Sequence, residues 1–402
     1  MKLKVAVFFG GESVEHEVSI ISAHQAIENL DQNKYEIIPI YISKNREFYT
    51  GEELLDLNNF ADMNILMKKL TQITLVKRKN KVMIEPVNKG LFSKTINTID
   101  VAMPVVHGTN GEDGSLQGYL EMLKLPYTGC TTIPAGVGQD KIFMKSILAY
   151  HHLPLVDWFW IYGHEMETKK DEILAKVHEI GYPVILKPAC LGSSIGIETA
   201  YNDEEFIEAV EETSKYDFKV IIERLVKNFV EINCSVRGTC YKAQASVLEQ
   251  VAKDESHDIM DFKDKYLGNG KAGSKSKSFS KIPNKTGSKG MASASRIVPA
   301  PISDEKTKEI QNMALEVFRV LQASGVCRID FMIDKDSDKT YITEINTIPG
   351  SLAYYLWDNM NISFSELLDG MIEDALDLDN HKSKMTFSFE SNILQGFIKK
   401  EL

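Results

Sequence analysis

The residues best suited to chemistry lie in one segment near the carboxyl end, VCRIDFMIDKDSDKTYITEINTIPG, which begins at Val326. Arg328 and Asp330 are two residues apart in an apolar, strand-like run, so their side chains point to one face of the strand. Glu344 and Asn346 repeat this spacing in the run that follows. The polar stretch DKDSDK between the runs is typical of a turn, and the segment therefore predicts a β-hairpin.

A hairpin centred near Ser337 places Asp330 opposite Glu344. It also places Arg328 opposite Asn346. Two facing carboxylates repel each other, whereas a divalent cation between them makes the arrangement favourable. Carboxylate and amide oxygens are ligands that Mg²⁺ takes, usually with substrate phosphates completing the shell. The alternative is a surface hairpin with its charges in water, but apolar residues on the intervening positions predict a buried opposite face. They are Ile329, Phe331, Ile345 and Ile348.

Two further groups near this hairpin could stabilise a developing negative charge. Arg328 beside a metal would suit a phosphoryl or oxyanion clamp. Pro349 and Gly350 end the second strand, and the backbone N–H of Gly350 is available to a substrate.

A second segment, VILKPACLGSSIGI, is typical of a phosphate-binding loop. Lys187 leaves a strand-like run, and Gly192-Ser193-Ser194-Ile195-Gly196 follows. Glycines let backbone N–H groups converge on a phosphate, and the hydroxyls of Ser193 and Ser194 add donors. A tight turn without function has the same composition. Lys141 is a lone lysine, which is normally a solvated surface residue.

Several acids stand where strands or helices begin or end. Glu223 ends the run KVIIERL and Glu231 follows eight residues later, where carboxylates could accept from an adenine amine and ribose hydroxyls. The turn GGESVEHE before a helical pattern contains Glu12, Glu15 and Glu17. These acids could cap that helix, or one of them could hold an ammonium group. His107 follows another strand-like run, and a lone histidine is more often structural than catalytic.

Residues 268–293 have a different composition, with six lysines, five glycines, six serines and no acidic residue. Such a segment cannot build a packed core. Two interpretations stay open, a solvated linker and a lid that brings positive charge over bound phosphate.

The elements that must position these residues alternate between strand and helix patterns in the first part of the chain. Such alternation predicts a Rossmann-like domain with a mostly parallel sheet. Strands and helices then mix in an α+β pattern. We expect an α/β domain at 1–130, a central subdomain at 131–226 and a C-terminal subdomain at 227–402, with the lysine-rich loop at about 265–300.

The bulk composition excludes some classes of protein. A net charge of −11 argues against a nucleic-acid binder, and no apolar stretch is long enough to span a membrane. The five cysteines include no CxxC pair, and the apolar run after Met1 is too short for a signal peptide. We therefore expect a cytoplasmic protein.

Taken together and in order, these motifs resemble the D-alanine–D-alanine ligases, a family of the ATP-grasp superfamily. The resemblance spans residues 5 to about 370. Its motifs are GGESVEHEVS at 10–19, HG and GEDG between 107 and 114, Asp140-Lys141, Lys187-Pro188, GSSIG at 192–196, Lys265-Tyr266, Arg328-Ile329-Asp330 and EINTIPG at 344–350.

The resemblance implies a two-subdomain ATP-grasp fold behind the N-terminal domain, and a ligase reaction through an acyl phosphate. Glu15 would hold the first ammonium group, linked toward Ser193 and Tyr266. Arg328 and the Gly350 N–H would stabilise the oxyanion.

The resemblance also implies the nucleotide and metal ligands. Two Mg²⁺ ions, with Mn²⁺ as an alternative metal, would be bound by Asp330, Glu344 and Asn346. The family's habit would make the protein a homodimer with D-alanine as its small-molecule substrate. The groups implied to bind ATP are Lys141, Lys187, Ser194, Glu223, Glu231 and Lys265.

Two departures from the family pattern concern the acceptor substrate. Tyr355 stands where the family commonly has a serine that meets the second substrate's carboxylate, and the lid is longer than usual. Tyr266 favours D-alanine as the acceptor, while D-serine and D-lactate stay open. The rival hypotheses are another ATP-grasp carboxylate–amine ligase and a non-catalytic nucleotide-binding protein.

Overall fold

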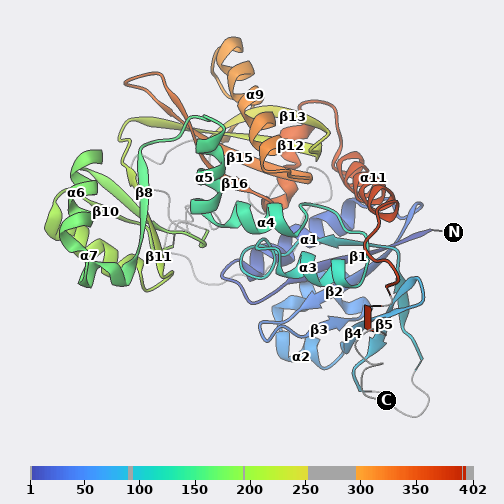
Figure 1. The fold of residues 1–402 in the computed structure, drawn as a ribbon. Helices are drawn as coiled ribbons and strands as arrows, with labels where there is room; N and C mark the ends of the chain where they lie inside the picture. The colour runs from blue at the N-terminus through green and yellow to red at the C-terminus, as the bar shows by residue number, and fades with distance from the viewer. Residues whose placement is uncertain (1, 89–93, 193–194, 252–295, 392, 395–402) are drawn as a thin grey trace, which may run out of the picture.

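The computed structural model describes residues 2–88, 94–192, 195–251, 296–391 and 393–394. These residues form a seven-stranded, a four-stranded and a five-stranded β-sheet, each packed against helices (Figure 1). Within the described residues, no helix is both long and apolar enough to cross a membrane.

The N-terminal sheet is parallel on one side and antiparallel on the other, in the order β6-β5-β4-β3-β2-β1-β7. β1 (Leu3–Gly10) pairs in parallel with β2 (Tyr35–Ile42) and β7 (Val101–Pro104), which confirms the parallel part of the prediction. Residues 48–99, whose sequence pattern is less regular, add an antiparallel meander. Its strands are β3 (Phe48–Thr50), β4 (Thr71–Arg78), β5 (Lys81–Pro86) and β6 (Asn97–Ile99).

Helices cover both faces of this sheet because side chains alternate along β1. Val5, Val7 and Phe9 belong to a core shared with α1 (His16–Asn29) and α11 (Phe364–Ser383). Ala6 and Phe8 belong to a second core with α3 (Ser115–Met122). The C-terminal helix α11 therefore packs into the N-terminal core, as its place beside β1 in Figure 1 indicates. The short elements η1 (Glu52–Leu55), η2 (Leu57–Ala61) and α2 (Met63–Met67) lie between β3 and β4 in the chain.

The four-stranded sheet is antiparallel, in the order β10-β9-β11-β8. Its strands are β8 (Trp158–Tyr162), β9 (Val184–Pro188), β10 (Glu198–Ala200) and β11 (Lys219–Arg224). One face packs on α6 (Lys170–Ile180) and α7 (Asp203–Thr213), and η3 (Gly163–Glu167) precedes α6.

The five-stranded sheet has the order β14-β13-β12-β15-β16. Its strands are β12 (Phe229–Thr239), β13 (Lys242–Val251), β14 (Arg296–Ile297), β15 (Gly325–Asp334) and β16 (Thr340–Asn346). α9 (Asp304–Val320) packs on this sheet through Ile310, Ala314 and Phe318, which recur at helical spacing.

The remaining helices join the sheets. α4 (Thr132–Gln139) and α5 (Lys141–Tyr150) lie between the N-terminal and four-stranded sheets in the chain, and η4 (Gly350–Ala353) and α10 (Tyr355–Asp358) follow β16. The domain boundaries expected after residues 130 and 226 fall between the three sheets, and they stay a prediction.

Candidate active site

The hairpin β15–β16 has the register that the sequence predicts. Asp330 pairs with Glu344, and Arg328 pairs with Asn346. The opposite face is buried, since Phe331 is 0% exposed and packs in the core beneath the five-stranded sheet. Burial of that face fixes the register, because a slip of one residue would turn the charged face into the core.

The Asp330 carboxylate is nearly enclosed and receives three hydrogen bonds. Arg328 donates twice, from Nε to Oδ1 at 2.6 Å and from Nη2 to Oδ2 at 2.7 Å. Asn346 Nδ2 donates to Oδ2 at 3.0 Å. Burial lowers the pKa of the Arg328 guanidinium, but Asp330 outweighs burial and raises this pKa well above its usual range. Arg328 is therefore a fixed positive charge beside the facing acids.

The donor set of the hairpin fits Mg²⁺. Asp330 and Glu344 contribute carboxylate oxygens from facing positions, and the amide of Asn346 adds a further oxygen. Within the part of the chain that the structure describes, no group of three or more histidines, cysteines or acids could hold a metal alone. Two acids and an amide suit a cation that keeps waters and substrate phosphates in its shell.

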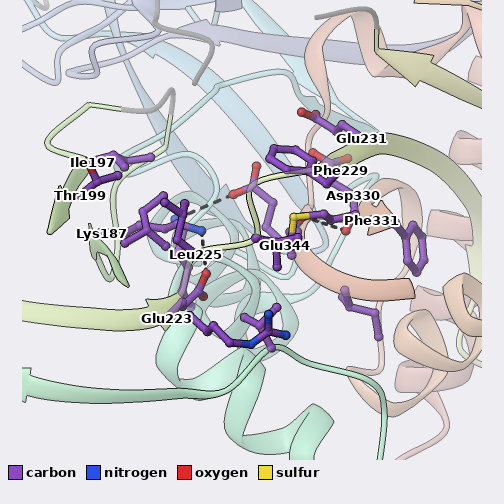
Figure 2. A pocket seen from close by; sticks show the side chains of 18 of the residues that line it. Lys187, Ile197, Thr199, Glu223, Leu225, Phe229, Glu231, Asp330, Phe331 and Glu344 are labelled. Atoms are coloured by element: carbon purple, nitrogen blue, oxygen red, sulfur yellow. Dashed lines mark hydrogen bonds and ion pairs between the residues drawn. The ribbon is translucent and has the colours of Figure 1, made fainter. Parts of the chain in front are cut away.

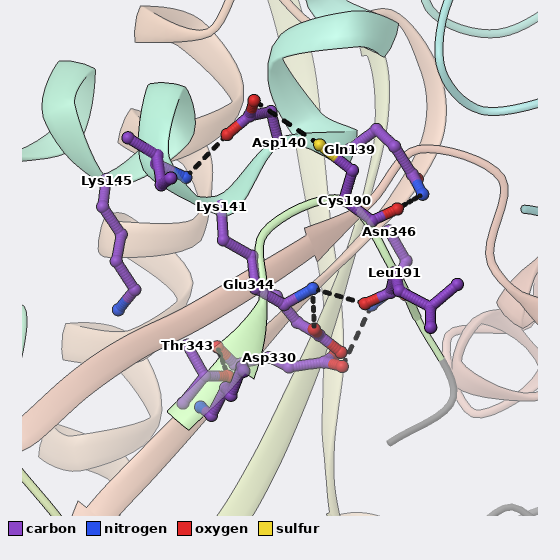
Figure 3. A network of polar contacts seen from close by, with 12 residues as sticks. Gln139, Asp140, Lys141, Lys145, Cys190, Leu191, Asp330, Thr343, Glu344 and Asn346 are labelled. Carbon is purple, nitrogen blue, oxygen red and sulfur yellow. Dashed lines mark hydrogen bonds and ion pairs between the residues drawn. The ribbon is translucent and has the colours of Figure 1, made fainter. Parts of the chain in front are cut away.

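Lys141 joins this hairpin to the segment after β9. It is the first residue of α5, whose N-terminus is capped by Asp140. The Lys141 ammonium donates to the carbonyl oxygen of Leu191 at 2.8 Å and lies 4.0 Å from Oε2 of Glu344. Figure 3 shows the ammonium between the Leu191 carbonyl and the hairpin. Lys141 thus joins the hairpin to the segment that runs into Gly192.

A buried cluster of charges joins α5, β9 and β11. Glu223 accepts from Lys187 at 2.7 Å and forms an ion pair with Lys145 at 2.9 Å. Burial alone would raise the pKa of the Glu223 carboxyl, but the two ammonium groups hold it at about 2. Burial lowers the pKa of Lys145 even beside Glu223, because the nearby lysines also repel it.

Lys145 is a site residue that we did not expect from the sequence. Its side chain is 0% exposed, although lysine is rarely buried without a partner. Its position four residues after Lys141 places both lysines on one face of α5, and this spacing is the signal that could have found it.

A cavity of about 550 Å³ lies between the four-stranded and five-stranded sheets (Figure 2). Glu223 and Lys187 line it from one sheet, and Glu231, Asp330 and Glu344 line it from the other. Its volume falls within the range usual for small-molecule sites.

A second cavity of about 100 Å³ adjoins the same charged face of the hairpin. Glu344, Lys141, Gly192 and Glu231 line both cavities, so the Glu344 carboxylate stands where a large and a small compartment meet. The remaining predicted residues in its wall are Glu15, Arg328, Asn346 and Gly350.

Glu15 lies at the N-terminal end of α1 and its side chain is turned toward the small cavity. A Cβ atom at Gly108 would lie 3.2 Å from Glu15 Oε2, and one at Gly192 would lie 3.8 Å from Oε1. The carboxylate is therefore beside Gly192. No hydrogen bond from the Glu15 side chain caps α1.

His107 is structural, in agreement with the more common role of a lone histidine. Its Nδ1 lies 2.8 Å from the carbonyl oxygen of Ile348, and its Nε2 lies 2.9 Å from Oγ of Ser22. Burial lowers the pKa of the imidazole. A neutral ring that donates through Nδ1 and accepts from Ser22 fits these contacts.

Glu112, in the N-terminal domain, forms hydrogen bonds to Gly108 and to Ile348, which follows β16. Its carboxyl group accepts from the backbone N–H of Gly108 at 2.8 Å and of Ile348 at 3.0 Å. Burial, together with the nearby Glu15, raises its pKa to about 8. The motif GEDG contains Glu112, but sequence inspection assigned this residue no role of its own because its partner lies 236 positions away.

The backbone after Gly350 is strained. Ser351, Leu352 and Ala353 have φ values of 53°, 51° and 50°, a left-handed conformation that costs residues with a Cβ atom about 1–2 kcal/mol each. The Ser351 N–H donates to Ser22 Oγ at 3.0 Å, and all three side chains are buried. This anchoring holds Gly350 in the wall of the small cavity.

Four predicted site residues cannot be placed. Ser193, Ser194, Lys265 and Tyr266 lie outside the described residues. The lysine-rich loop at 268–293 also lies outside them.

The N-terminal α/β domain, followed by two sheets that enclose a nucleotide-sized cavity beside facing acids, defines an ATP-grasp ligase. A family model described as the D-ala D-ala ligase N-terminus matches residues 4–130. A second, described as the D-ala D-ala ligase C-terminus, matches residues 147–282 and 274–373. The chain belongs to the D-alanine–D-alanine ligase family.

Individual relatives agree over almost the whole length. The D-alanine–D-alanine ligase of Thermosipho melanesiensis is 38% identical over 396 residues, covering 98% of this chain and 98% of that protein. The D-alanine–D-alanine ligase of a Thermoanaerobacter species is 35% identical over 389 residues, covering 95% of this chain and 99% of that protein.

Solved structures give the same result. The D-alanine–D-alanine ligase of Coxiella burnetii has a TM-score of 0.74 at 27% identity and covers 95% of this chain and 96% of its own. A D-Ala:D-Ser ligase from Enterococcus faecalis has a TM-score of 0.74 at 28% identity and covers 93% of this chain and 100% of its own.

Proposed function

We propose that this protein uses ATP to join two D-alanine molecules into D-alanyl-D-alanine, a precursor of peptidoglycan, with release of ADP and phosphate. The observation that carries the proposal is the position of Glu344 at the junction of the two cavities, with Asp330 paired opposite it in the wall of the larger one. The larger cavity suits a nucleotide and the smaller one suits amino acids, so the γ-phosphate would meet a carboxylate at the facing acids.

In the larger cavity, the buried charges would bind and orient ATP. Lys187 and Lys141 would contact the phosphates, and Glu223 would accept from the adenine amine. Glu231 would accept from the ribose hydroxyls. Because Lys145 and Lys187 keep Glu223 ionised, this carboxylate remains an acceptor at any physiological pH.

The metal would lie at the hairpin. Asp330, Glu344 and Asn346 would hold Mg²⁺, with Mn²⁺ as the alternative, and the bound cation neutralises charge on the outer phosphates. Asp330 must then exchange at least part of its contact with Arg328 for the metal.

In the smaller cavity, Glu15 would bind the ammonium group of the first D-alanine. The carboxylate oxygen of that substrate attacks the γ-phosphorus, and ADP leaves. The amine of the second D-alanine then attacks the acyl carbon and loses a proton, and phosphate departs from the tetrahedral intermediate. Arg328 and the Gly350 N–H would stabilise the oxyanion, an effect typically worth ~10²–10³ in rate for each donor.

A coupled assay of phosphate release with ATP and Mg²⁺, joined to mass spectrometry of the product, tests this function. We expect release to depend on D-alanine and to yield the dipeptide. D-Serine and D-lactate are tested as acceptors because Tyr355 replaces the family's usual serine. No stimulation by any D-amino acid would remove the assignment.

The location and assembly of the protein are also proposals. Consumption of ATP and five free cysteines suit the cytoplasm. A homodimer is a prediction that sedimentation analysis can test.

A further inference from the structure

The wall of the small cavity contains an arginine that the expected reaction does not use. Arg296 is the first residue of β14 and lines this cavity together with Asn233 of β12, Val251 of β13 and Arg328. β14 pairs with the end of β13, where Arg296 faces Val251. Arg296 therefore lies in the wall formed by the five-stranded sheet, where Arg328 also lies.

Two side chains hold the Arg296 guanidinium in place. It lies over the Tyr355 ring, 4.7 Å from the ring centroid. Its Nη1 lies 3.7 Å from Oε2 of Glu249, which is an ion pair but not a hydrogen bond. Tyr355 in turn donates through its hydroxyl to Glu249 Oε1 at 2.9 Å, and Asn233 Nδ2 donates to the same oxygen at 3.0 Å.

This cluster contains buried polar atoms that lack hydrogen bonds. Among the described residues, Arg296 Nε, Asn233 Oδ1 and Glu249 Oε2 have no hydrogen-bond partner. Arg296 and Asn233 line the small cavity, and Glu249 lies behind them as the ion-pair partner of Arg296. Buried polar groups are nearly always satisfied, so three such atoms in one cluster call for an explanation. A small ligand with both donors and acceptors would satisfy these atoms, and the volume and lining of the cavity allow such a ligand.

We propose that Arg296 binds the carboxylate of the second amino acid, with Tyr355 and Glu249 as positioning residues. The proposal rests on the proposed function. Arg328 already donates to Asp330 through two nitrogens. Among the described residues, the Arg296 guanidinium instead contacts a ring and an acid beyond hydrogen-bonding distance. A planar guanidinium presents two parallel donors, which match a carboxylate.

The proposal also gives a reason for Tyr355. A tyrosine at this position brings no short hydroxyl into the cavity, since its hydroxyl is bound to Glu249. Its ring instead supports Arg296, which supplies donors in place of the absent serine. The cavity of about 100 Å³ suits an amino acid better than a nucleotide phosphate chain.

A competition between two acceptors tests the proposal. The enzyme receives ATP, Mg²⁺, D-alanine and D-alaninamide, and mass spectrometry measures the ratio of dipeptide to dipeptide amide. D-Alaninamide lacks the carboxylate, so this ratio reports recognition of that group. We expect Arg296→Gln to lower the ratio about 10- to 100-fold, the usual effect of a lost charge-assisted hydrogen bond. Arg296→Lys should lower it less.

Matched variants separate binding from folding. Arg319→Gln removes an exposed arginine of α9 and should leave the ratio at the wild-type value. Tyr355→Phe keeps the ring but loses the bond to Glu249, and should lower the ratio by a smaller factor than Arg296→Gln. If Arg296→Gln does not fold, Arg296→Lys and Tyr355→Phe carry the test.

Specific outcomes would overturn the proposal. A wild-type product ratio in folded Arg296 variants would do so, and so would a rise in the KM for ATP with the ratio unchanged. If the wild-type enzyme forms no dipeptide from D-alanine, the proposed function fails instead, and the two failures are therefore distinguishable.

Discussion

At the scale of single residues, Asp330 must serve two partners. In the structure it receives both hydrogen bonds of the Arg328 fork, while the proposed reaction requires it to bind a cation. Glu344 faces it across the hairpin and approaches Lys141 at 4.0 Å. Asp330 can exchange Arg328 for a cation without a change elsewhere in the fold, because Arg328, Asp330 and Glu344 share one face of one hairpin.

The first prediction concerns Glu344. Glu344→Gln keeps the shape of the side chain but removes the charge that would hold Mg²⁺. We expect phosphate release to fall about 10²–10³-fold, with an unchanged circular dichroism spectrum. Glu211→Gln, at an exposed position of α7, is the control and should be fully active. Near-normal activity of Glu344→Gln would refute the metal role.

The second prediction concerns Glu15. Glu15→Gln removes the negative charge proposed to hold the first ammonium group, so the KM for D-alanine at the donor site should rise about 10- to 100-fold. The KM for ATP should change little, because Glu15 is absent from the wall of the larger cavity. Steady-state kinetics with each substrate varied in turn measures both values.

Glu17→Gln is the matched control for this prediction. Glu17 lies in the first turn of the same helix, and its side chain is 69% exposed and paired with Lys44. If the Glu15→Gln and Glu17→Gln variants both have the wild-type KM for D-alanine, Glu15 is not the ammonium site.

At the scale of elements, α5 is attached to the four-stranded sheet by charge rather than by apolar contact alone. Lys145 projects from the helix to Glu223 at the end of β11, and Lys187 of β9 shares that carboxylate. One acid therefore sets the position of two strands and a helix around the larger cavity.

The third prediction follows from this arrangement. Glu223→Gln leaves two ammonium groups buried without their shared partner, and breaking such a pair typically costs about 3–5 kcal/mol. We expect a clear fall in the thermal unfolding midpoint, measured by circular dichroism. The double variant Lys145→Met with Glu223→Gln should recover part of the loss, since one uncompensated charge is removed. An unchanged midpoint in the single variant would contradict the prediction.

At the scale of the whole molecule, the active-site wall is assembled from chain segments that are distant in sequence. Glu112, His107 and Ser22 of the N-terminal domain fasten the loop from Ile348 to Ser351. α11 adds an apolar connection, since it packs in the core beneath β1 and α1. The N-terminal sheet is thereby held against the hairpin, and both cavities depend on that junction.

The fourth prediction is a pH dependence of this junction. Glu112 has a pKa of about 8 in the folded protein against 4.5 for an ordinary glutamate, so between these values the folded state holds a proton that the unfolded chain releases. Its contribution to stability is complete below pH 4.5 and is lost as pH rises toward 8, with a slope of at most about 1.4 kcal/mol per pH unit.

Glu112→Gln tests this dependence because its amide stays uncharged at every pH. We expect the unfolding midpoint of the variant, relative to that of the wild type, to rise between pH 6 and pH 8, as measured by calorimetry. Parallel curves for the two proteins over this range would show that Glu112 does not titrate there.

The sequence by itself determined the local parts of this protein. The alternation of charged and apolar residues around Asp330 and Glu344 specified the hairpin, its register and its buried face, because a strand has a fixed side-chain period. The order of the motifs identified the family. The parallel strands β1, β2 and β7 followed from strand–helix alternation, whereas the antiparallel meander of β3 to β6 had too weak a pattern to assign.

Only the tertiary structure decided which distant groups meet. Lys145 meets Glu223 across 78 positions of the chain, and Glu112 meets Ile348 across 236 positions. No local periodicity encodes such contacts. The same holds for Arg296, whose partners come from β13 and α10. A side chain's charge can be read from the sequence, but its pKa and its role depend on which groups surround it after folding.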